Sequence, residues 1–428
     1  MRAPDRGESL IVDDVPRALA GGNPGRIASL DFVRGVAVLG ILFANITGFA
    51  HPMLAYYWPP ALGVPANETD KAFWLFQFIV IDGKMRGLFT LLFGAGMALF
   101  MERAWARGDD RTLQLHRLLW LFAFGSAHYF LLWRGDILAL YAVWGIAALP
   151  FMRRSARTLL ATGLTLYLVG SVLSLETGLQ RLAAWTPVME HVAVERALAE
   201  RATVLQSSYG SIVASDLPRR VAEFVDQLGS GLGETLPLIL VGMAFYRFGL
   251  FSGRISSRTL ARWGWAGVLA GTVLTAPLGL WLHLQDYPLS LTEFVFIDAA
   301  QAARLPAIVG LAALLAAIAR RAGSSAFGGR ITAAGRLALT NYLGTSVVMT
   351  ALFNGWGLGL FGSLHRAALF GIVLLAWTVM LVWSPLWLRH FGLGPCEWLW
   401  RCLTYRQWPT LRRTTEIKSP VAIAIDSH

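Results

Sequence analysis

Apolar stretches of about 17 to 25 residues recur along this chain, and each is long enough to cross a bilayer as a helix. They lack the two-residue alternation of membrane-barrel strands. Of the 428 residues, 55% are hydrophobic and only 15% are charged, a balance too apolar for an ordinary soluble protein of this length. The sequence therefore predicts an all-α fold, specifically a polytopic membrane helix bundle.

Short arginine-rich loops alternate along the chain with loops that contain few basic residues. Because basic residues gather in the cytoplasmic loops of membrane proteins, this alternation predicts about ten transmembrane helices, both termini cytoplasmic, in a bacterial cytoplasmic (inner) membrane. It also explains the net charge of +11 without a nucleic-acid partner. The expected spans lie near 29–50, 71–101 and 113–132, at two positions between 136 and 175, and near 232–251, 261–283, 295–319, 335–353 and 366–387.

The spans form two five-helix halves, at 26–175 and 231–406. Between them, residues 176–230 predict amphipathic helices on the outer membrane surface, with a soluble cap over the site as the alternative. The polar, proline-containing segment 1–25 predicts a disordered cytoplasmic tail, and 407–428 a basic cytoplasmic tail. The basic carboxyl end is expected to bind anionic membrane lipids.

Sequence signatures of common soluble enzymes are missing. The chain has no G-x-S-x-G, P-loop, H-E-x-x-H or dinucleotide motif in a fitting context. Its two cysteines, Cys396 and Cys402, are too few for a zinc site, and no metal is expected. Both fall on the predicted cytoplasmic side, where a disulfide is not expected. Polar residues within the spans are therefore the main indication of function.

The first span combines an apolar helix with polar residues at both ends. The stretch from Arg26 reads R-I-A-S-L-D-F-V-R-G-V-A-V-L-G-I-L-F-A-N. Asp31 and Arg34 are three residues apart, so they share a helix face and can neutralise each other at the cytoplasmic interface. Asn45 is a polar group that lipid would penalise. The segment is either a first membrane helix with a satisfied ion pair or the wall of a ligand-binding cavity.

The second apolar stretch, 71–101, exceeds one ordinary span by about ten residues. It is interrupted by D-G-K-M-R, which contains Asp82, Lys84 and Arg86. Either the span begins after this interruption, or one long tilted helix carries three charges inside. Both alternatives place these charges in the outer half of the protein.

A histidine and an aspartate flank a sharp turn at 133–135. His128 precedes the turn, and Asp136 follows it at a position suited to capping a helix. So short a turn predicts antiparallel neighbouring helices, which would bring Asp136 or Asp82 within reach of the imidazole for general-base catalysis. The alternative is a hydrogen-bonded strut between helices. His51, in the loop after the first span, is a second candidate base, with a solvated loop histidine as its alternative.

Polar groups in spans are costly unless they are paired or line a wet cavity. We therefore expect the charged and imidazole groups to surround one hydrated pocket that connects the two leaflets. The expected catalytic residues are His128, His51, Asp136 and Asp82. The residues expected to bind substrate or cofactor are Asp31, Arg34, Asn45, Lys84, Arg86, Arg304, Arg336, Asn341 and Arg401.

Several longer motifs occur in order between Arg26 and Arg413. They are R-I-A-S-L-D-F-V-R-G followed by Asn45, D-G-K-M-R-G-L-F-T-L-L-F-G-A-G, H-Y-F-L-L-W-R-G-D-I-L-A-L-Y-A, G-R-L-A-L-T-N-Y-L and G-P-C-E-W-L-W-R-C-L-T-Y. Together they resemble the YeiB-like bacterial membrane proteins, the domain of unknown function 418. This resemblance implies a multi-pass membrane fold rather than one particular activity.

The amino-terminal half, through S-L-D-F-V-R-G-V-A, also resembles membrane acyltransferases such as heparan glucosaminide N-acetyltransferase. This resemblance implies acyl transfer from cytoplasmic acyl-CoA to a sugar hydroxyl or amine on the far side. Many bacterial acyltransferases have a catalytic histidine eleven residues after an arginine, whereas the residue eleven after Arg34 is Asn45. The glucosaminide enzyme also has asparagine there, and its histidine lies in the loop that corresponds to the loop of His51.

The leading hypothesis is a membrane-bound O- or N-acyltransferase that moves an acyl group from acyl-CoA to an extracytoplasmic sugar or small-molecule acceptor. Arg34, Arg336 and Arg401 are expected to bind the phosphates of acyl-CoA, because arginine forks suit phosphate.

In this hypothesis His51 or His128 deprotonates the acceptor, and Lys84 or Arg86 stabilises the developing oxyanion. Two alternatives stay open. One is a transporter or permease for a small polar solute, which an interrupted second span also suits, above all if the second half contains a corresponding break. The other is a non-enzymatic membrane protein of the cell envelope.

Overall fold

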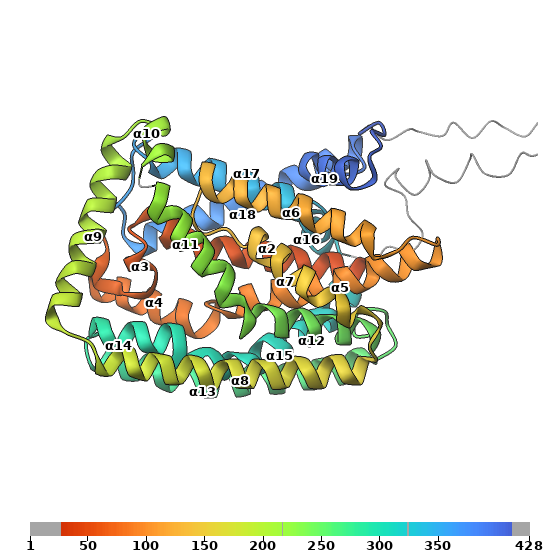
Figure 1. Cartoon of the computed structure of the whole chain (residues 1–428), viewed down its shortest axis with the longest axis horizontal. Coiled ribbons are helices and arrows are strands. Elements are labelled where there is room, and N and C mark those ends of the chain that lie inside the picture. The colour runs from red at the N-terminus through yellow and green to blue at the C-terminus, as the bar shows by residue number, and fades with distance from the viewer. Residues whose placement is uncertain (1–26, 216, 323–324, 413–428) are drawn as a thin grey trace, which may run out of the picture.

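The computed structural model describes residues 27–215, 217–322 and 325–412, and over these residues the fold is all-α, as predicted. The expected amino-terminal tail, and the expected carboxyl-terminal tail beyond Arg412, lie outside the described residues. Most of the long helices run along the long axis of the molecule (Figure 1).

The helices of the first half are α2 (Ala28–Ala50), α3 (Leu54–Tyr57), α4 (Glu68–Val80), α5 (Lys84–Ala106), α6 (Arg111–Leu131), α7 (Leu138–Ala148) and α8 (Ala156–Ala183). Those that follow are α9 (Pro187–Gln206), α10 (Tyr209–Ala214), α11 (Leu217–Gly229), α12 (Thr235–Arg247), α13 (Ser257–Leu284), α14 (Leu289–Phe294), α15 (Ala300–Ala322), α16 (Ala326–Arg336), α17 (Ala338–Phe353), α18 (Arg366–His390) and α19 (Pro395–Tyr405).

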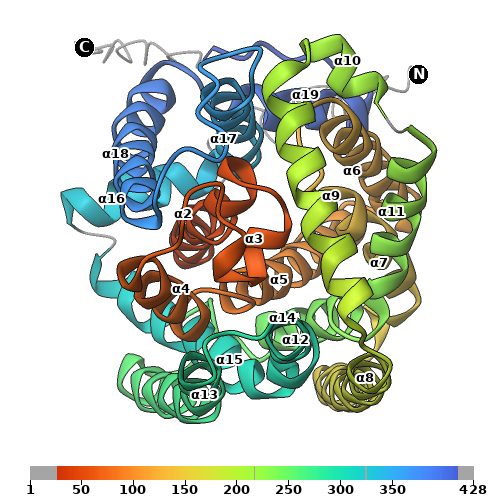
Figure 2. The ribbon, with the colours of Figure 1, turned by 90° about the vertical axis from the view of Figure 1, so that its left-hand side faces the viewer.

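Helix α2 lies inside the bundle, whereas α8, α13 and α18 lie at its edge (Figure 2). In α2, 83% of the most apolar window is buried, but in each of the other three the share is 22%. Their outer faces carry exposed apolar side chains such as Val172, Trp263 and Leu375. Such faces are suited to contact lipid, whose tails are as apolar as these side chains.

Among the residues that the structure describes, six helical segments are long and apolar enough to cross a membrane, and a seventh is added if the bent pair 217–232 and 235–247 counts as one span. The chain is therefore a multi-pass membrane protein. The expected number of about ten spans is not confirmed. Helix α6, expected as the third span, is not among these segments, and α7 with its 3-10 extension and α17 are apolar but shorter than a full span. The cytoplasmic orientation of the termini stays a prediction.

The expected interruption of the second apolar stretch is present. Helix α4 ends at Val80, α5 begins at Lys84, and Gly83 between them has a φ of 72°, a conformation that favours glycine. A second irregularity, the π-helical segment Val295–Ala299, separates α14 from α15. Arg304 on α15 contacts both irregularities, because a Cβ atom at Gly83 would lie 2.5 Å from its Cδ and its Nη2 donates to the carbonyl of Phe296.

The helix that leads into the region between the two halves is longer than expected. Helix α8 does not end near residue 175 but continues to Ala183, and its extension is held by an ion pair of 2.5 Å between Arg181 and Asp298. Helix α9 then crosses the end of the bundle over α3 (Figure 2). There the backbone N–H of Met53 donates to Glu200 on α9. The position of this region relative to a membrane stays a prediction.

Candidate functional site

The α6–α7 turn brings a histidine and an aspartate together. Gly125 lets the two helices approach closely, since a Cβ atom there would overlap the backbone of Ala139. Nδ1 of His128 lies 2.9 Å from Oδ1 of Asp136, whose Oδ2 accepts the N–H of Ala139 at 2.8 Å. Both side chains are buried. The expected contact between Asp136 and the imidazole is confirmed, and the other expected partner, Asp82, lies in a different group of residues.

A serine that the sequence analysis did not identify completes this group. Nε2 of His128 lies 2.8 Å from Oγ of Ser346 on α17. In the tautomer that has its proton on Nδ1, the ring donates to Asp136, and Nε2 is left to accept from the Ser346 hydroxyl. The hydroxyl also lies 3.3 Å from the carbonyl of Tyr342, a longer contact. Hydroxyl, imidazole and carboxylate thus follow the order of nucleophile, base and orienting group.

Ser346 lines a small cavity between α2 and α17. The cavity has a volume of about 10 Å³, which is room for about one water molecule. Asn45 is the polar residue that α2 contributes, and its side-chain amide makes no hydrogen bond to another described residue. The ring of Tyr342 closes the cavity near His128, with ring centres 5.1 Å apart. The lining residues are Val38, Ile41, Leu42, Asn45, Phe49, Tyr342, Thr345 and Ser346.

One stripe of α2 leads from this cavity toward the expected cytoplasmic end. Val38, Ile41 and Asn45 recur at helical spacing on the cavity wall, and Arg34 precedes Val38 by four residues on the same face. Arg34 forms the expected ion pair with Asp31, at 3.1 Å. Eleven residues of helix place Asn45 roughly 16 Å from Arg34 along the axis.

Arg34 and Arg401 both lie close enough to Arg117 for their charges to act on it, and we call the three the inner arginine group (Arg34, Arg117 and Arg401). The guanidinium of Arg117 lies between two aromatic rings, 4.6 Å from the centre of Phe100 and 4.3 Å from that of Trp400. The charges of both Arg34 and Arg401 act on it. Cations from α2, α6 and α19 therefore lie within electrostatic range of Arg117 at the Arg34 end of the stripe. Arg117 was not predicted, because its aromatic contacts join distant segments.

A carboxylate of α19 caps the start of helix α17. Oε1 of Glu397 accepts the backbone N–H groups of Leu339 at 2.7 Å and Thr340 at 3.1 Å, and its Oε2 accepts the Thr340 hydroxyl at 2.5 Å. Burial raises the pKa of this carboxyl, and the hydrogen bonds from Thr340 oppose the rise. An acceptor at a helix start satisfies N–H groups that have no partner within the helix.

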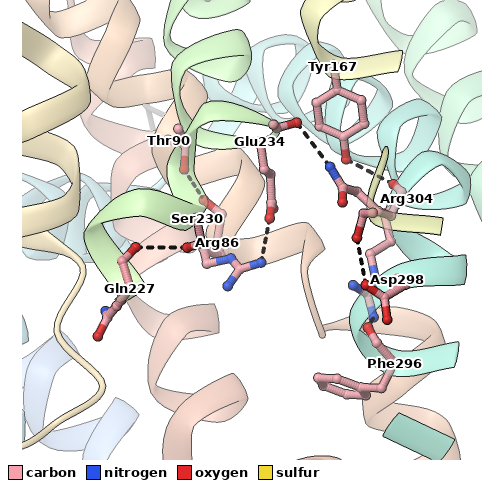
Figure 3. Close-up of polar contacts among 12 residues, drawn as sticks. Arg86, Thr90, Tyr167, Gln227, Ser230, Glu234, Phe296, Asp298 and Arg304 are labelled. Atoms are coloured by element: carbon pink, nitrogen blue, oxygen red, sulfur yellow. Dashed lines mark hydrogen bonds and ion pairs between the residues drawn. The ribbon is translucent and has the colours of Figure 1, made fainter. Parts of the chain in front are cut away.

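The charges at the α4–α5 break form a separate group. Arg86 pairs with Glu234 at 2.6 Å, as Figure 3 shows, and its side chain is half exposed. Lys84 is buried, and its Nζ donates to the carbonyl of Phe78 at 3.0 Å. Oδ1 of Asp82 accepts from Gln77 at 3.1 Å, while its buried Oδ2 has no partner among the described residues.

Arg304 extends this group from α15. Its Nη2 donates to the carbonyl of Phe296 at 2.8 Å (Figure 3), and its guanidinium lies over the rings of Phe78 and Phe296. Its buried Nε has no hydrogen-bond partner in the described part of the chain. The break in α4–α5 and the π-helical segment are therefore joined by one buried cation.

His51 and His128 have different hydrogen-bond partners, and neither histidine lines the cavity. Nε2 of His51 donates to the carbonyl of Leu364 at 2.9 Å, and Nδ1 accepts the N–H of Gly63 at 3.2 Å. Burial, helped by the positive charge of Arg366, lowers the pKa of His51 to about 4. The imidazole is neutral at neutral pH, with both nitrogens engaged by the backbone.

Asn341 and Arg336 also have local partners. The Asn341 amide donates to the carbonyl of Ala334 and the hydroxyl of Ser384, both at 3.1 Å, and accepts from the indole of Trp383 at 2.9 Å. Arg336 donates to the carbonyl of Gly392 at 3.2 Å.

The expected single hydrated pocket around all polar residues is not found in the described structure. The candidates divide into the cavity group with its inner arginines, the charged group at the helix break, and residues held by local partners. Their catalytic and binding roles stay predictions. Within the described ranges, no group of three or more His, Cys, Asp or Glu side chains could hold a metal ion.

Comparisons with known proteins place this geometry in context. A family model described as a protein of unknown function (DUF418) matches residues 245–407. The uncharacterized protein YeiB of Escherichia coli (strain K12) is 33% identical over 399 residues, which cover 91% of this chain and 99% of that protein. YxaH of Bacillus subtilis (strain 168) is 31% identical, with 92% of this chain and 97% of that protein covered. No solved structure matches the chain.

Proposed function

The chain belongs to the YeiB-like DUF418 family of membrane proteins, and from this premise we propose that it transfers an acyl group from acyl-CoA to an acceptor hydroxyl or amine. The observation that carries the proposal is the buried His128–Asp136 pair, which reaches the cavity through Ser346. A histidine held by a carboxylate on one nitrogen, with a hydroxyl on the other, is arranged to remove a proton at that position.

The extended shape of the donor acyl-CoA matches the length of the α2 stripe between Arg34 and Asn45. Its phosphates lie at one end of the molecule and its thioester at the other, joined by an extended pantetheine arm. In the proposal, the inner arginine group binds the phosphates, and the thioester reaches Asn45, roughly 16 Å further along the helix. Aromatic rings around Arg117 restrict its guanidinium, which reduces the entropy lost on binding.

Asn45 is the proposed donor to the carbonyl oxygen of the acyl group. Its side-chain amide lines the cavity and is not engaged by another described residue. Lys84 and Arg86, the donors expected from the sequence, instead contact Phe78 and Glu234. A donor positioned before the reaction stabilises the oxyanion of the tetrahedral intermediate.

Substrate entry requires movement, since the cavity holds about one water molecule in this conformation. Side chains of α2 and α17 form its walls, so the acyl chain enters when these two helices separate. The acceptor, an extracytoplasmic sugar or small molecule, then approaches from the end of the bundle covered by α9. Such opening steps are common in enzymes that exclude water.

Binding of the donor is the first test. Full-length protein in detergent is heated with acetyl-CoA, and free CoA is added as competitor. We expect a higher melting temperature that CoA competes for, and an affinity about 10 to 100 times lower in Arg117→Ala, because a charge-assisted contact contributes about 1.5–3 kcal/mol. Arg258→Ala, an exposed arginine at the start of α13, is the matched control. No melting shift at millimolar acetyl-CoA contradicts the proposal.

A transporter for a small polar solute is the second candidate, and one observation favours it. The break between α4 and α5 meets the π-helical segment between α14 and α15, with the buried Arg304 between them. Paired interruptions of membrane helices are typical of transporter binding sites. Solute uptake into proteoliposomes, abolished by Arg304→Ala and unchanged by His128→Ala, would favour transport over acyl transfer.

A further inference from the structure

We propose that Ser346 is the nucleophile of the transfer and carries the acyl group as a serine ester between donor and acceptor. The inference rests on the proposed acyl-transfer function and adds a covalent step to it. Its basis is the position of the Ser346 hydroxyl, which lines the cavity and lies 2.8 Å from Nε2 of His128.

The hydroxyl of Ser346 occupies the position that an acceptor would need in a direct transfer. Nδ1 of His128 is held by Asp136, so Nε2 is the one ring nitrogen that can remove a proton. The hydroxyl of Ser346 already lies 2.8 Å from that nitrogen. An acceptor that lost its proton directly to His128 would first have to displace this hydroxyl.

Neighbouring hydroxyls on α17 behave differently. Thr345 donates to the carbonyl of Asn341 at 2.6 Å, and Thr350 donates to that of Ser346 at 2.8 Å, the usual back-bonding of such residues in membrane helices. The corresponding distance from Ser346 to Tyr342 is 3.3 Å, longer than its distance to the imidazole. The Ser346 hydroxyl therefore keeps a long contact with its own helix and has a shorter one with the imidazole of His128.

The first half-reaction forms the ester. Ser346 Oγ attacks the thioester carbonyl as its proton passes to Nε2 of His128, and the new imidazolium is stabilised by Asp136. The Asn45 amide donates to the oxyanion. When the tetrahedral intermediate collapses, the C–S bond breaks, the proton passes from His128 to the sulfur, and CoA leaves as the thiol.

The second half-reaction reverses these roles. His128 takes the proton of the acceptor hydroxyl or amine, which attacks the carbonyl of the serine ester. The bond from the acyl carbon to Ser346 Oγ breaks, and the proton on Nε2 returns to Oγ. The acceptor leaves acylated, and the protein regains its starting state without an oxidant or reductant.

Trapping the ester tests the inference. Full-length protein is incubated with radiolabelled acetyl-CoA without acceptor, denatured and digested, and the peptide containing Ser346 is analysed by mass spectrometry. We expect one acetyl group at Ser346, released by hydroxylamine. Thr350→Ala, which removes a neighbouring hydroxyl outside the cavity, keeps the label, and Ser346→Ala lacks it.

The rate of transfer separates this inference from the function on which it rests. We expect Ser346→Ala to lose acceptor acylation at least ~100-fold while binding acetyl-CoA normally, and Ser346→Cys to form a labelled thioester. Parallel lines in double-reciprocal plots indicate the two-step route. If Ser346→Ala keeps wild-type acylation, the covalent step is overturned and acyl transfer stands. If the wild type neither binds acetyl-CoA nor releases CoA, both proposals fall.

Discussion

Glu397 on α19 accepts the backbone N–H of Leu339 at 2.7 Å, and this contact fixes the first turn of α17. The same carboxylate accepts from the backbone and hydroxyl of Thr340. Because α17 carries one wall of the cavity, including Ser346, the position of that wall depends on a residue at the far end of the chain. A negative group at a helix start also interacts favourably with the helix dipole.

Replacing Glu397 is expected to destabilise the protein. Glu397→Ala leaves N–H groups of α17 without an acceptor, which costs about 1–2 kcal/mol. Glu397→Gln keeps one acceptor oxygen and should lose less. Thermal unfolding in detergent measures the difference, with Glu190→Ala on the exposed face of α9 as control. Equal melting temperatures of Glu397→Ala and wild type would show that the carboxylate at the start of α17 contributes nothing to stability.

Asp136→Asn is expected to remove activity with little effect on stability. An asparagine that keeps accepting the Ala139 N–H turns its NH₂ group toward Nδ1 of His128, so the ring carries its proton on Nε2 and no longer accepts from Ser346. We expect acyl transfer to fall by roughly 10³-fold or more. The assay compares CoA release with acetyl-CoA binding. Full release by a variant that binds normally would exclude His128 as the base.

The sequence was informative where interacting residues lie close in the chain. A short turn between two apolar helices predicted that Asp136 or Asp82 would reach His128, and Asp136 does so. Helical spacing predicted the pair of Asp31 and Arg34. The all-α membrane class followed from the length of the apolar stretches. These inferences depend on turn length and helical spacing, which can be read from a single sequence.

Contacts between distant segments were not predictable in this way. Ser346 lies 218 positions from His128, and a serine in an apolar helix is usually a back-bonded hydroxyl. Asn341 looked like a ligand-binding group because its partner, the indole of Trp383, belongs to another helix. The sequence therefore identified polar groups that need partners but not which of them satisfy one another.

The pH dependence of stability should contain a contribution from His51. Its pKa is about 4 in the folded protein, because of burial and the charge of Arg366, and near 6.5 in the unfolded chain. The unfolded state binds the proton more tightly. The contribution of the neutral His51 to the free energy of unfolding is therefore fully present above pH 6.5. It is lost as pH falls toward 4, by about 3 kcal/mol in all.

His51→Gln and His51→Asn remove this titration. Each variant is unfolded thermally or chemically between pH 4 and 8 alongside the wild type, and the difference curve isolates the histidine from the other titrating groups. We expect the free energy of unfolding of the wild type minus that of the variant to be constant above pH 6.5 and to decrease below that pH. A difference that is independent of pH across this range would show that His51 is not a buried, neutral imidazole hydrogen-bonded to the backbone of Leu364 and Gly63.

Gly83→Ala tests the junction where the two irregular helices meet. The glycine has a φ of 72°, and a Cβ atom there would lie 2.5 Å from Cδ of Arg304. Gly108 provides a matched control, because its φ is 84° but a Cβ atom there meets nothing within 4 Å. Alanine at either position costs about 1 kcal/mol for the left-handed backbone. Gly83→Ala should lose about 1–3 kcal/mol more, since Arg304 is buried and must shift. Equal thermal stability of the two variants would mean that Arg304 moves without cost and that the junction is loosely packed.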